Sequence, residues 1–496
     1  MSKKFQNYID GRWVDAISGK TFENRNPANW DEVIGTFPLS SKEEVDQAVK
    51  AARRAFESWR LVPAPKRGDI MKRVGDILTA RKEEIAKQMT REMGKVLLET
   101  RGDVQEGIDT AYYGASEARR LFGRTVPSEL PNKFNMAMRV PIGVAAIITP
   151  WNFPMAIPTW KIFPALVCGN TVVFKPASDT PATATTLVEI LVEAGVPPGV
   201  INIVHGGGRE VGIGLVEHPD VDLVSFTGST PVGKKISEVA SNTLKRVSLE
   251  LGGKNAQIVM DDANLELALE GVLWGAFGTT GQRCTATSRL IVHEKVYDKF
   301  VSMVVDHAKK LRLGDGLKEN VDVGPCVNEG QRKIVDEYVQ IGKGEGAKVL
   351  AGGKVAVGDG LSKGWFYEPT VLGGVTPQMR VAREEIFGPV LSVIKVKTLE
   401  EAIAVSNNTT YGLSSSIYTQ NINNAYTAIR DIKAGITYVN SPTIGAEAHM
   451  PFGGVKETGN GHREGGWTVY EFYTEWKTVY VDYSGKLQRA QIDNAD

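Results

Sequence analysis

From about residue 140 onward, short apolar runs alternate with stretches of helical periodicity, and this alternation constrains the fold more than any other feature of the chain. The first runs are rich in β-branched residues and cover Val144–Ile148, Thr171–Phe174, Ile201–Val204 and Leu223–Phe226. Between them lie helical stretches such as Ala182–Ala194 and Gly208–Glu217. Strands that alternate with helices predict an α/β fold with a parallel sheet covered by helices.

A second series of the same kind follows. Its predicted strands are Ala256–Val259, Arg289–Val292, Val390–Lys395, Ser414–Tyr418 and Ile436–Val439, and its helices lie near 264–279, 295–311, 328–345 and 399–406. Gly252–Lys254 separates the two series, so we expect a domain boundary there. Residues 42–122 are typical of helices instead, and Ser40–Glu43 resembles a capping box at their start. A length of 496 residues favours two or three packed units.

Composition excludes several function classes. The 58 Lys and Arg residues balance 58 Asp and Glu residues, whereas nucleic-acid and anionic-membrane binders carry an excess of basic side chains. We see no secretory signal and no apolar run long enough to span a bilayer, so we expect a cytoplasmic protein. Three cysteines, Cys168, Cys284 and Cys326, fit a reducing compartment. We predict no metal site.

Two glycine-rich segments resemble phosphate-binding motifs. Gly342–Ala347 matches the dinucleotide fingerprint, but it follows a helix, so we interpret it as a helix C-terminus and turn. Gly228–Lys235 comes close to a P-loop, except that Lys235 stands where a hydroxyl should bind Mg²⁺. A helix N-terminus at Gly228 and Ser229 would suit a pyrophosphate; a simple strand–turn–helix connection fits this fragment equally well.

Cys284 is the candidate nucleophile. Its neighbours are small and polar, and positive or helix-terminal surroundings would populate its reactive thiolate. Cys168 and Cys326 lie in apolar surroundings and are predicted to be buried packing residues. None of the histidines has a context that suggests a partner for a cysteine hydrolase.

A carboxylate and an amide could assist Cys284. Glu250 lies in an apolar stretch at a Gly-Gly corner, where burial would raise its pKa and make it a general base. Pairing with Lys254 is the alternative. Asn152 lies among bulky residues in Pro150-Trp-Asn-Phe-Pro154 and could donate to an oxyanion, or could be a simple turn residue.

Together these segments resemble the NAD(P)-dependent aldehyde dehydrogenase superfamily over nearly the whole chain. Each motif is weak alone, but seven in one order are specific: Pro150-Trp-Asn-Phe-Pro154, Phe174-Lys-Pro-Ala-Ser178, Phe226-Thr-Gly-Ser-Thr230, Leu249-Glu-Leu-Gly-Gly253, Gly281-Gln-Arg-Cys284, Glu384-Glu-Ile-Phe-Gly-Pro389 and Pro451-Phe-Gly-Gly454.

The resemblance implies an aldehyde dehydrogenase-like fold with a Rossmann-like cofactor domain, an α/β catalytic domain and a small oligomerisation β element. The implied division is 1–124 with 143–252 for the cofactor, 253–448 for catalysis, 125–142 with 470–496 for oligomerisation, and 449–469 returning to the cofactor domain and substrate channel. A hairpin near 125–142 would combine with the C-terminal strand Glu475–Tyr483, giving homodimers or homotetramers.

The resemblance also implies a mechanism and a cofactor site for NAD or NADP. Cys284 would attack the aldehyde, Asn152 would hold the oxyanion, and Glu250 would activate the water that hydrolyses the thioester. The cofactor-binding residues implied are Trp151, Lys175, Ser178, Gly228, Ser229, Leu251, Gly252, Glu385 and Phe387. Lys161 and Glu464 are further polar candidates, although one extra residue before Glu464 departs from the family pattern.

Two departures bear on specificity. Ser178 stands where members strict for NAD often carry a glutamate, so we expect NADP to be accepted. The candidate substrate residues are Phe153, Trp160, Arg283, Thr285, His449 and Phe452. The stretch Thr443–Met450 and Arg283 suggest a polar wall with cationic character, which favours a carboxylate-bearing semialdehyde such as 2-oxoglutarate semialdehyde; Arg283, Glu447 and His449 as solvated rim residues are the alternative.

Other interpretations stay open at this point. A broad-specificity aliphatic or aromatic aldehyde dehydrogenase fits the same motifs. A CoA-acylating member is disfavoured by Glu250, a P-loop-like nucleotide hydrolase by Lys235, and a catalytically silent member by the presence of Cys284 together with Asn152.

Overall fold

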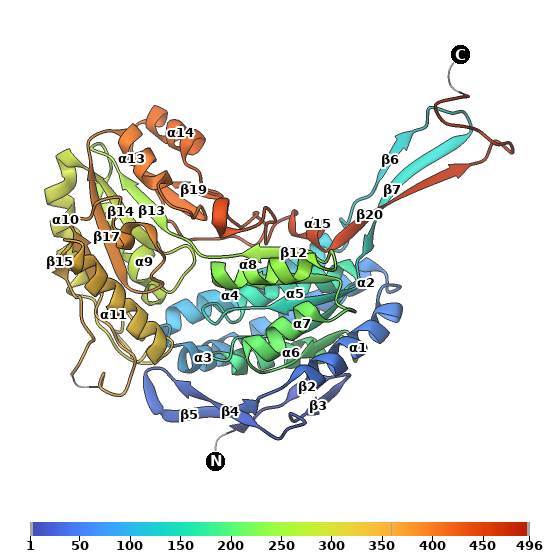
Figure 1. Ribbon diagram of the computed structural model, residues 1–496, viewed down its shortest axis with the longest axis horizontal. Coiled ribbons are helices and arrows are strands. Elements are labelled where there is room, and N and C mark those ends of the chain that lie inside the picture. The colour runs from blue at the N-terminus through green and yellow to red at the C-terminus, as the bar shows by residue number, and fades with distance from the viewer. Residues whose placement is uncertain (1–2, 359, 494–496) are drawn as a thin grey trace.

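The computed structural model describes residues 3–358 and 360–493, and its centre is a parallel sheet with helices on both faces (Figure 1). The strand order in this first sheet is β12 (Arg246–Glu250), β11 (Leu223–Thr227), β8 (Val144–Ile148), β9 (Thr171–Lys175), β10 (Ile201–Ile203), β2 (Asn7–Ile9) and β3 (Arg12–Val14). The first five strands are parallel, and β8, β9 and β11 are buried throughout. The predicted β-branched runs therefore form the centre of this sheet.

The second series of predicted strands forms a separate sheet. Its order is β15 (Lys348–Ala351), β16 (Thr370–Gly373), β17 (Val390–Val396), β14 (Thr287–His293), β13 (Asn255–Val259), β18 (Ser414–Tyr418) and β19 (Ile436–Val439), and β15 alone of these is antiparallel to its neighbour. Because β12 ends at Glu250 and β13 begins at Asn255, the chain crosses between the two sheets over residues 251–254, where the Gly-Gly break lies.

Helices cover both sheets. In the N-terminal half they are α1 (Lys42–Trp59), α2 (Ala64–Ala80), α3 (Lys82–Met93), α4 (Leu97–Glu117), α5 (Ala156–Cys168), α6 (Pro181–Glu193), a π-helical turn (Gly208–Ile213), α7 (Gly214–Glu217) and α8 (Thr230–Ser241). Around the second sheet lie α9 (Leu265–Phe277), α10 (Glu294–Ala308), α11 (Glu329–Gly344), α12 (Arg380–Arg383), α13 (Leu399–Asn407) and α14 (Ile422–Asp431), whereas α15 (Val469–Phe472) packs against α5 and β20. The predicted helices of residues 42–122 are confirmed.

Several sequence expectations need correction. The capping box is formed one residue later than predicted, by Ser41 and Glu44. The predicted helix over Gly208–Glu217 is a π-helical turn followed by α7, because its N-terminal glycines do not favour a regular α-helix. Short elements that lack clear periodicity were not predicted, among them α5, which contains Pro164, and a third sheet of β1 (Lys3–Lys4), β5 (Asn29–Pro38) and β4 (Thr21–Asn26). The Gly342–Ala347 motif lies at the C-terminus of α11, as predicted.

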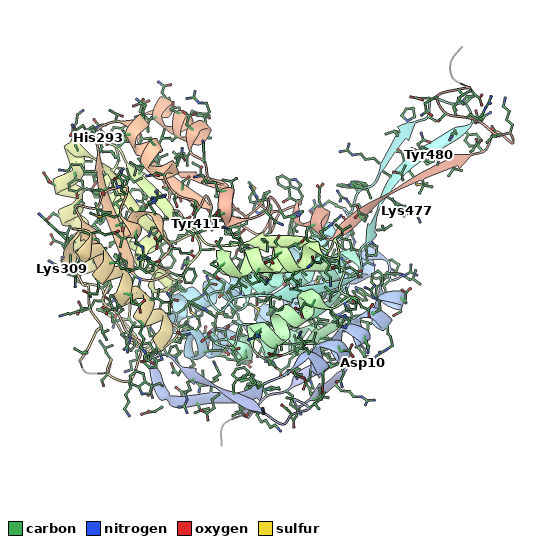
Figure 2. The ribbon with its side chains drawn as sticks, viewed as in Figure 1. Asp10, His293, Lys309, Tyr411, Lys477 and Tyr480 are labelled. Atoms are coloured by element: carbon green, nitrogen blue, oxygen red, sulfur yellow. The ribbon has the colours of Figure 1, made fainter. Side chains whose placement is uncertain are left out.

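A three-stranded arm projects from the body (Figure 1). It consists of β20 (Thr474–Asp482), β7 (Lys133–Pro141) and β6 (Arg124–Pro127), paired antiparallel in that order. The predicted pairing of a hairpin near 125–142 with the C-terminal strand is therefore confirmed. Lys477 and Tyr480 lie on this arm in Figure 2. Within the described residues, no helix is both long and apolar enough to cross a membrane.

Candidate active site

Cys284 lies where two cavities meet. One, of about 210 Å³, is lined by Asn152, Glu385 and Phe387 among others; the second, of about 320 Å³, is lined by Trp160, Arg283 and Phe452 among others. Cys284 and Ile157 line both. A thiol in this position can contact one ligand on each side.

The loop before Cys284 has an unusual backbone. Thr279, Thr280 and Gly281 follow α9 with φ values of 53°, 58° and 66°, all in the left-handed region. For β-branched threonine this conformation costs on the order of 1 kcal/mol or more per residue, so surrounding contacts must hold it. Thr280 Oγ1 donates to the Gly324 carbonyl at 2.9 Å, and the Gln282 side chain accepts from Val327 N at 2.9 Å. Cys284, the candidate nucleophile, is thus carried by a strained loop that is held from several sides.

The thiol environment differs from the sequence expectation. Burial raises the pKa of Cys284, and the carboxylates of Glu250 and Glu385 raise it further. The surroundings therefore disfavour the thiolate, contrary to the expectation from the sequence. The reason lies in the tertiary structure, because the Arg283 guanidinium contacts Glu99 and the Trp274 ring. A base is therefore needed to ionise the thiol. Cys168 and Cys326 are buried, and burial raises the pKa of each to about 12, which fits their predicted packing role.

Asn152 lies on the loop after β8 and is 2% exposed. Its side-chain Nδ2 donates to the Gln282 carbonyl at 3.1 Å, and Asn152 lines the first cavity together with Cys284. The amide is therefore tied to the nucleophile loop and faces the same space as the thiol. This is the arrangement that an oxyanion donor requires.

Glu250 ends β12 and is 3% exposed, and its Oε1 has no hydrogen-bond partner in the described part of the chain. Burial raises its pKa well above the usual range, and the Glu464 charge adds to the effect. The alternative that Glu250 pairs with Lys254 is wrong, because within the same residues Lys254 Nζ also has no partner. A buried, unpaired carboxylate with a raised pKa is suited to accept a proton.

Lys161 and Glu464 form a buried ion pair near Glu250, with 2.7 Å between Nζ and Oε1. Lys161 Nζ also donates to Ser225 Oγ at 2.9 Å. One extra residue before Glu464 departs from the family pattern. The Glu464 backbone is nevertheless held in place, because it exchanges hydrogen bonds with the Phe452 backbone. Glu464 raises and Lys161 lowers the pKa of Glu250.

The first cavity brings together one group of the predicted cofactor residues. Trp151, Leu251, Gly252, Glu385 and Phe387 line it. The Trp151 and Phe387 rings meet edge-to-face at 5.3 Å, and Glu385 accepts from Gly253 N at 2.8 Å. A Cβ at Gly252 would lie 2.4 Å from Glu385 Oε2, so a larger residue there would displace the Glu385 carboxylate.

Gln331 also lines the first cavity, and sequence reasoning missed it. From the first turn of α11, its Nε2 donates to the carbonyls of Ile386 and Phe387 at 3.1 and 2.9 Å. These bonds hold Phe387, whose φ of 57° is left-handed. No periodicity or motif marks Gln331, because its partners lie some 55 residues away.

A third cavity, of about 630 Å³, continues the cleft past Pro150, Thr227 and Gly228, which line both it and the first cavity. Its lining includes Lys175 and Ser178. The N-terminus of α8 lies where the first and third cavities meet, and Gly228 and Ser229 precede this helix. A cleft of two cavities joined at a helix N-terminus fits a dinucleotide, with the pyrophosphate on the free backbone N–H groups.

The second cavity gathers most of the predicted substrate residues. Phe153, Trp160, Arg283, Thr285 and Phe452 all line it, and the Trp160 and Phe452 rings lie 4.9 Å apart. Arg283 is not a solvated rim residue, since its side chain is 11% exposed and its guanidinium lies over the Trp274 ring at 4.8 Å.

The prediction for His449 and its neighbours is wrong. His449 is exposed, lies 3.3 Å from Glu447, and is not among the described residues that line the substrate cavity. From the same segment Ile444, Gly445 and Ala446 line the cavity instead, and of these Ile444 is buried. The polar part of the wall comes from α4, whose acidic residues at helical spacing, Glu99, Asp103 and Glu106, share one face.

Comparisons with known proteins agree with this geometry. A sequence profile of the aldehyde dehydrogenase family matches residues 13–479. The chain belongs to the aldehyde dehydrogenase family. It is 43% identical to an alpha-ketoglutaric semialdehyde dehydrogenase of Bacillus subtilis over 96% of this chain and 98% of that protein, and 45% identical to an alpha-ketoglutarate semialdehyde dehydrogenase of Haloferax volcanii over 97% and 100%.

Solved structures of the family share the fold. A crystal structure of betaine aldehyde dehydrogenase from Staphylococcus aureus in complex with NAD+ matches with a TM-score of 0.95 and 37% identity, over 97% of this chain and 95% of that one. Family membership removes the nucleotide-hydrolase interpretation. Consistently, Lys235, at the end of the P-loop-like segment, pairs with Glu238 at 3.1 Å.

Proposed function

We propose that this member oxidises an aldehyde to the carboxylic acid through a covalent intermediate on Cys284, with hydrolytic release. The observation that carries the proposal is the position of Cys284 between the first cavity, here called the cofactor cavity, and the second cavity, called the substrate cavity. Asn152 lines the cofactor cavity with it. Glu250, buried and unpaired among the described residues, is the base. Catalysis by a thiol and a carboxylate needs no metal ligands in this arrangement.

The proposed steps use these three side chains. The Cys284 thiol passes its proton to a solvent water molecule as its sulfur bonds to the aldehyde carbon, and the carbonyl oxygen becomes an oxyanion held by Asn152 Nδ2 and the Cys284 backbone N–H. The nicotinamide, when bound, supplies the acceptor for the hydride that leaves this carbon. Water then attacks the resulting thioester while Glu250 takes its proton; the C–S bond breaks and the acid is released.

We further propose that the substrate carries a carboxylate, with 2-oxoglutarate semialdehyde as the leading candidate. Two of the similar proteins are named as dehydrogenases of this semialdehyde. In addition, Arg283 is the one Lys or Arg side chain among the described residues that line the substrate cavity. The aromatic lining of Phe153, Trp160 and Phe452 favours the alternative of a broad-specificity aliphatic or aromatic aldehyde dehydrogenase.

Replacing Arg283 with methionine tests the substrate class. A charge-assisted hydrogen bond to a carboxylate contributes about 1.5–3 kcal/mol, so we expect kcat/KM for 2-oxoglutarate semialdehyde to fall by roughly 10- to 100-fold. Hexanal and benzaldehyde are the controls, and their kcat/KM should change much less. If the wild-type enzyme used these neutral aldehydes as well as or better than semialdehydes, the proposed substrate class would be wrong.

For the cofactor, we propose that both NAD and NADP are accepted. Ser178 lines the third cavity with Arg209 and Lys235, so two basic groups lie near the expected position of a 2′-phosphate. Burial lowers the pKa of Lys175, in the same cavity, to about 8.

Ser178→Glu tests this proposal. A glutamate would bind the ribose hydroxyls of NAD and repel a 2′-phosphate, so KM for NADP should rise by about tenfold or more while KM for NAD stays the same or falls. Steady-state rates with each cofactor are the measurement. Ser178→Thr, which adds no charge, is the matched control. Absence of NADP turnover by the wild-type enzyme would refute the proposal.

We also propose the domain division 1–124 with 143–252, 253–448, 125–142 with 470–496, and 449–469, and a homodimer or homotetramer assembled through the arm. Support comes from its exposed apolar side chains: Val126, Phe134, Met138, Trp476, Tyr480 and Val481 are all at least 42% exposed. A small sheet that exposes so many large apolar groups is suited to a partner subunit. A cytoplasmic location is supported by three free cysteines.

A further inference from the structure

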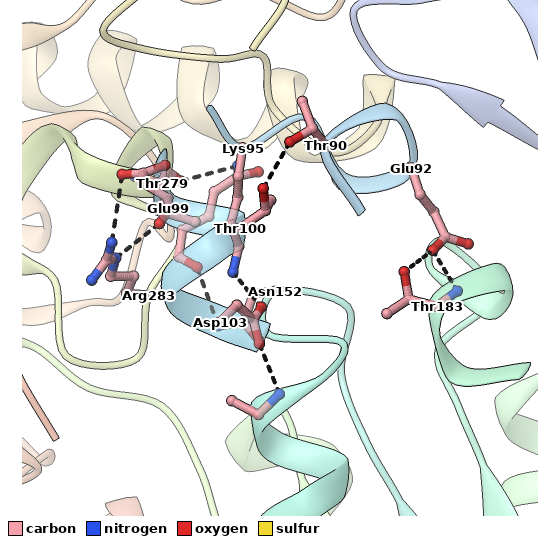
Figure 3. A network of polar contacts seen from close by, with 12 residues as sticks. Thr90, Glu92, Lys95, Glu99, Thr100, Asp103, Asn152, Thr183, Thr279 and Arg283 are labelled. Carbon is pink, nitrogen blue, oxygen red and sulfur yellow. Dashed lines mark hydrogen bonds and ion pairs between the residues drawn. The ribbon is translucent and has the colours of Figure 1, made fainter. Parts of the chain in front are cut away.

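The strained loop before Cys284 has one carboxylate at its centre. Glu99, in the first turn of α4, accepts from the backbone N–H of Thr279 at 2.6 Å through Oε1. The same oxygen lies 3.5 Å from Arg283 Nη2, and Arg283 Nε donates to Thr279 Oγ1 at 2.9 Å. Figure 3 shows these three side chains together. One acceptor therefore holds both ends of the segment that runs from the left-handed residues to the nucleophile.

The support of Glu99 is itself rigid. Its side chain is 3% exposed, and its helix is fixed by the buried ion pair between Lys95 Nζ and Asp103 Oδ2 at 2.8 Å. Asp103 Oδ1 also accepts from Ala156 N at 2.7 Å, which ties α4 to the start of α5. Lys95 Nζ lies 3.5 Å from the centre of the Phe153 ring. Because α4 is held in this way, the buried Glu99 carboxylate has little freedom to follow the loop if the loop moves.

We propose that Glu99 is a positioning residue for Cys284: its carboxylate keeps Thr279 and Thr280 left-handed and holds Arg283 against the substrate cavity. Glu99 acts through the loop and forms no bond to the reacting atoms. The same carboxylate links the backbone that sets the thiol position to the cation expected to bind the substrate carboxylate. This inference rests on the proposed function, because it takes Cys284 as the nucleophile.

Glu99→Ala is the direct test. A displacement of the nucleophile by about 1 Å lowers turnover by about 100-fold, so we expect a loss of this size in kcat with hexanal and with 2-oxoglutarate semialdehyde alike. KM for the semialdehyde should rise in addition, because Arg283 loses its anchor. The dissociation constant for NAD should change by less than about twofold, since none of the described cofactor residues contacts Glu99. Glu99→Gln retains an acceptor for Thr279 and should lose less activity than Glu99→Ala.

A rescue variant separates positioning from general stability. Asparagine tolerates the left-handed region far better than threonine, so Thr279→Asn in the Glu99→Ala background should recover kcat at least about fivefold. Glu44→Gln is the matched control: Glu44 is likewise buried and accepts two backbone N–H groups, from Ile17 and Ser41, but lies in α1 away from every described cavity. It should leave kcat unchanged.

Three results would overturn the inference: Glu99→Ala with kcat close to that of the wild type, Glu44→Gln with an equal loss of kcat, or no recovery in the double variant. Failure of the proposed function looks different. If Cys284 were not the nucleophile, its own replacement would leave turnover intact whatever the Glu99 variants did.

Discussion

Replacing Cys284 with alanine should abolish aldehyde oxidation, with kcat falling by at least about 10⁴-fold. In the proposed mechanism the thiol bonds to the substrate carbon. Among the described residues, Cys284 and the apolar Ile157 are the two that line both the first and the second cavity. The chain offers no nearby substitute among the described residues, because Cys168 and Cys326 are buried elsewhere in the core. Formation of NADH or NADPH, followed at 340 nm, is the measurement.

Two controls make the result specific. Cys284→Ser retains the size and polarity of the side chain, but its hydroxyl is a far weaker nucleophile, so its turnover should also be very low. Both variants should bind NAD with nearly the affinity of the wild type, because the cofactor residues are untouched. An alanine variant as active as the wild type would contradict the assignment, whereas loss of cofactor binding would point to damage of the fold.

Glu250→Gln should separate oxidation from hydrolysis. The amide is close in shape but cannot accept a proton from water, so steady-state kcat should fall by about 10²- to 10⁴-fold. If an acyl-enzyme accumulates, each active site should release one equivalent of reduced cofactor in a burst before turnover stalls. Rapid-mixing measurements with enzyme at micromolar concentration would resolve the burst. Thermal unfolding of the variant should change little, since Glu250 Oε1 has no partner to lose among the described residues.

The pH profile gives an independent check. Because burial raises the pKa of Glu250, its basic form is populated only above that raised pKa, and kcat limited by hydrolysis should increase as the pH rises through it. Glu250→Gln should lose this increase. Coenzyme A added to the wild type provides the contrasting outcome: if it accelerated turnover and yielded an acyl-CoA, the enzyme would belong to the acylating branch and hydrolytic release would be wrong.

The local sequence was enough to predict the parallel strands of the fold and the candidate catalytic residues. Alternating β-branched runs and helical stretches predicted the parallel strands of both sheets, because strand and helix periodicity are properties of short segments. The order of seven motifs indicated the family, and with it Cys284, Glu250, Asn152 and the cofactor cleft. Signals of this kind are carried by neighbouring residues and by chain order alone.

Elements without such signals could not be predicted. The N-terminal strands β1–β5 and the proline-containing α5 owe their structure to packing against the rest of the protein. Likewise, the sequence suggested a polar wall from Thr443–Met450, yet Ile444, Gly445 and Ala446 line the cavity while Glu447 and His449 are exposed. Which side of a loop is buried depends on what covers it.

The chemistry of the nucleophile was decided only by the tertiary structure. Arg283 is adjacent to Cys284 in sequence, but its guanidinium turns to Glu99 and Trp274, and the thiol lies among carboxylates that raise its pKa. Glu99 and Thr279 are separated by 180 residues, and no periodicity connects them. The sequence thus indicated the candidate catalytic residues, whereas contacts between distant segments determined how they are charged and held, because electrostatics and hydrogen bonds depend on distance in space and not along the chain.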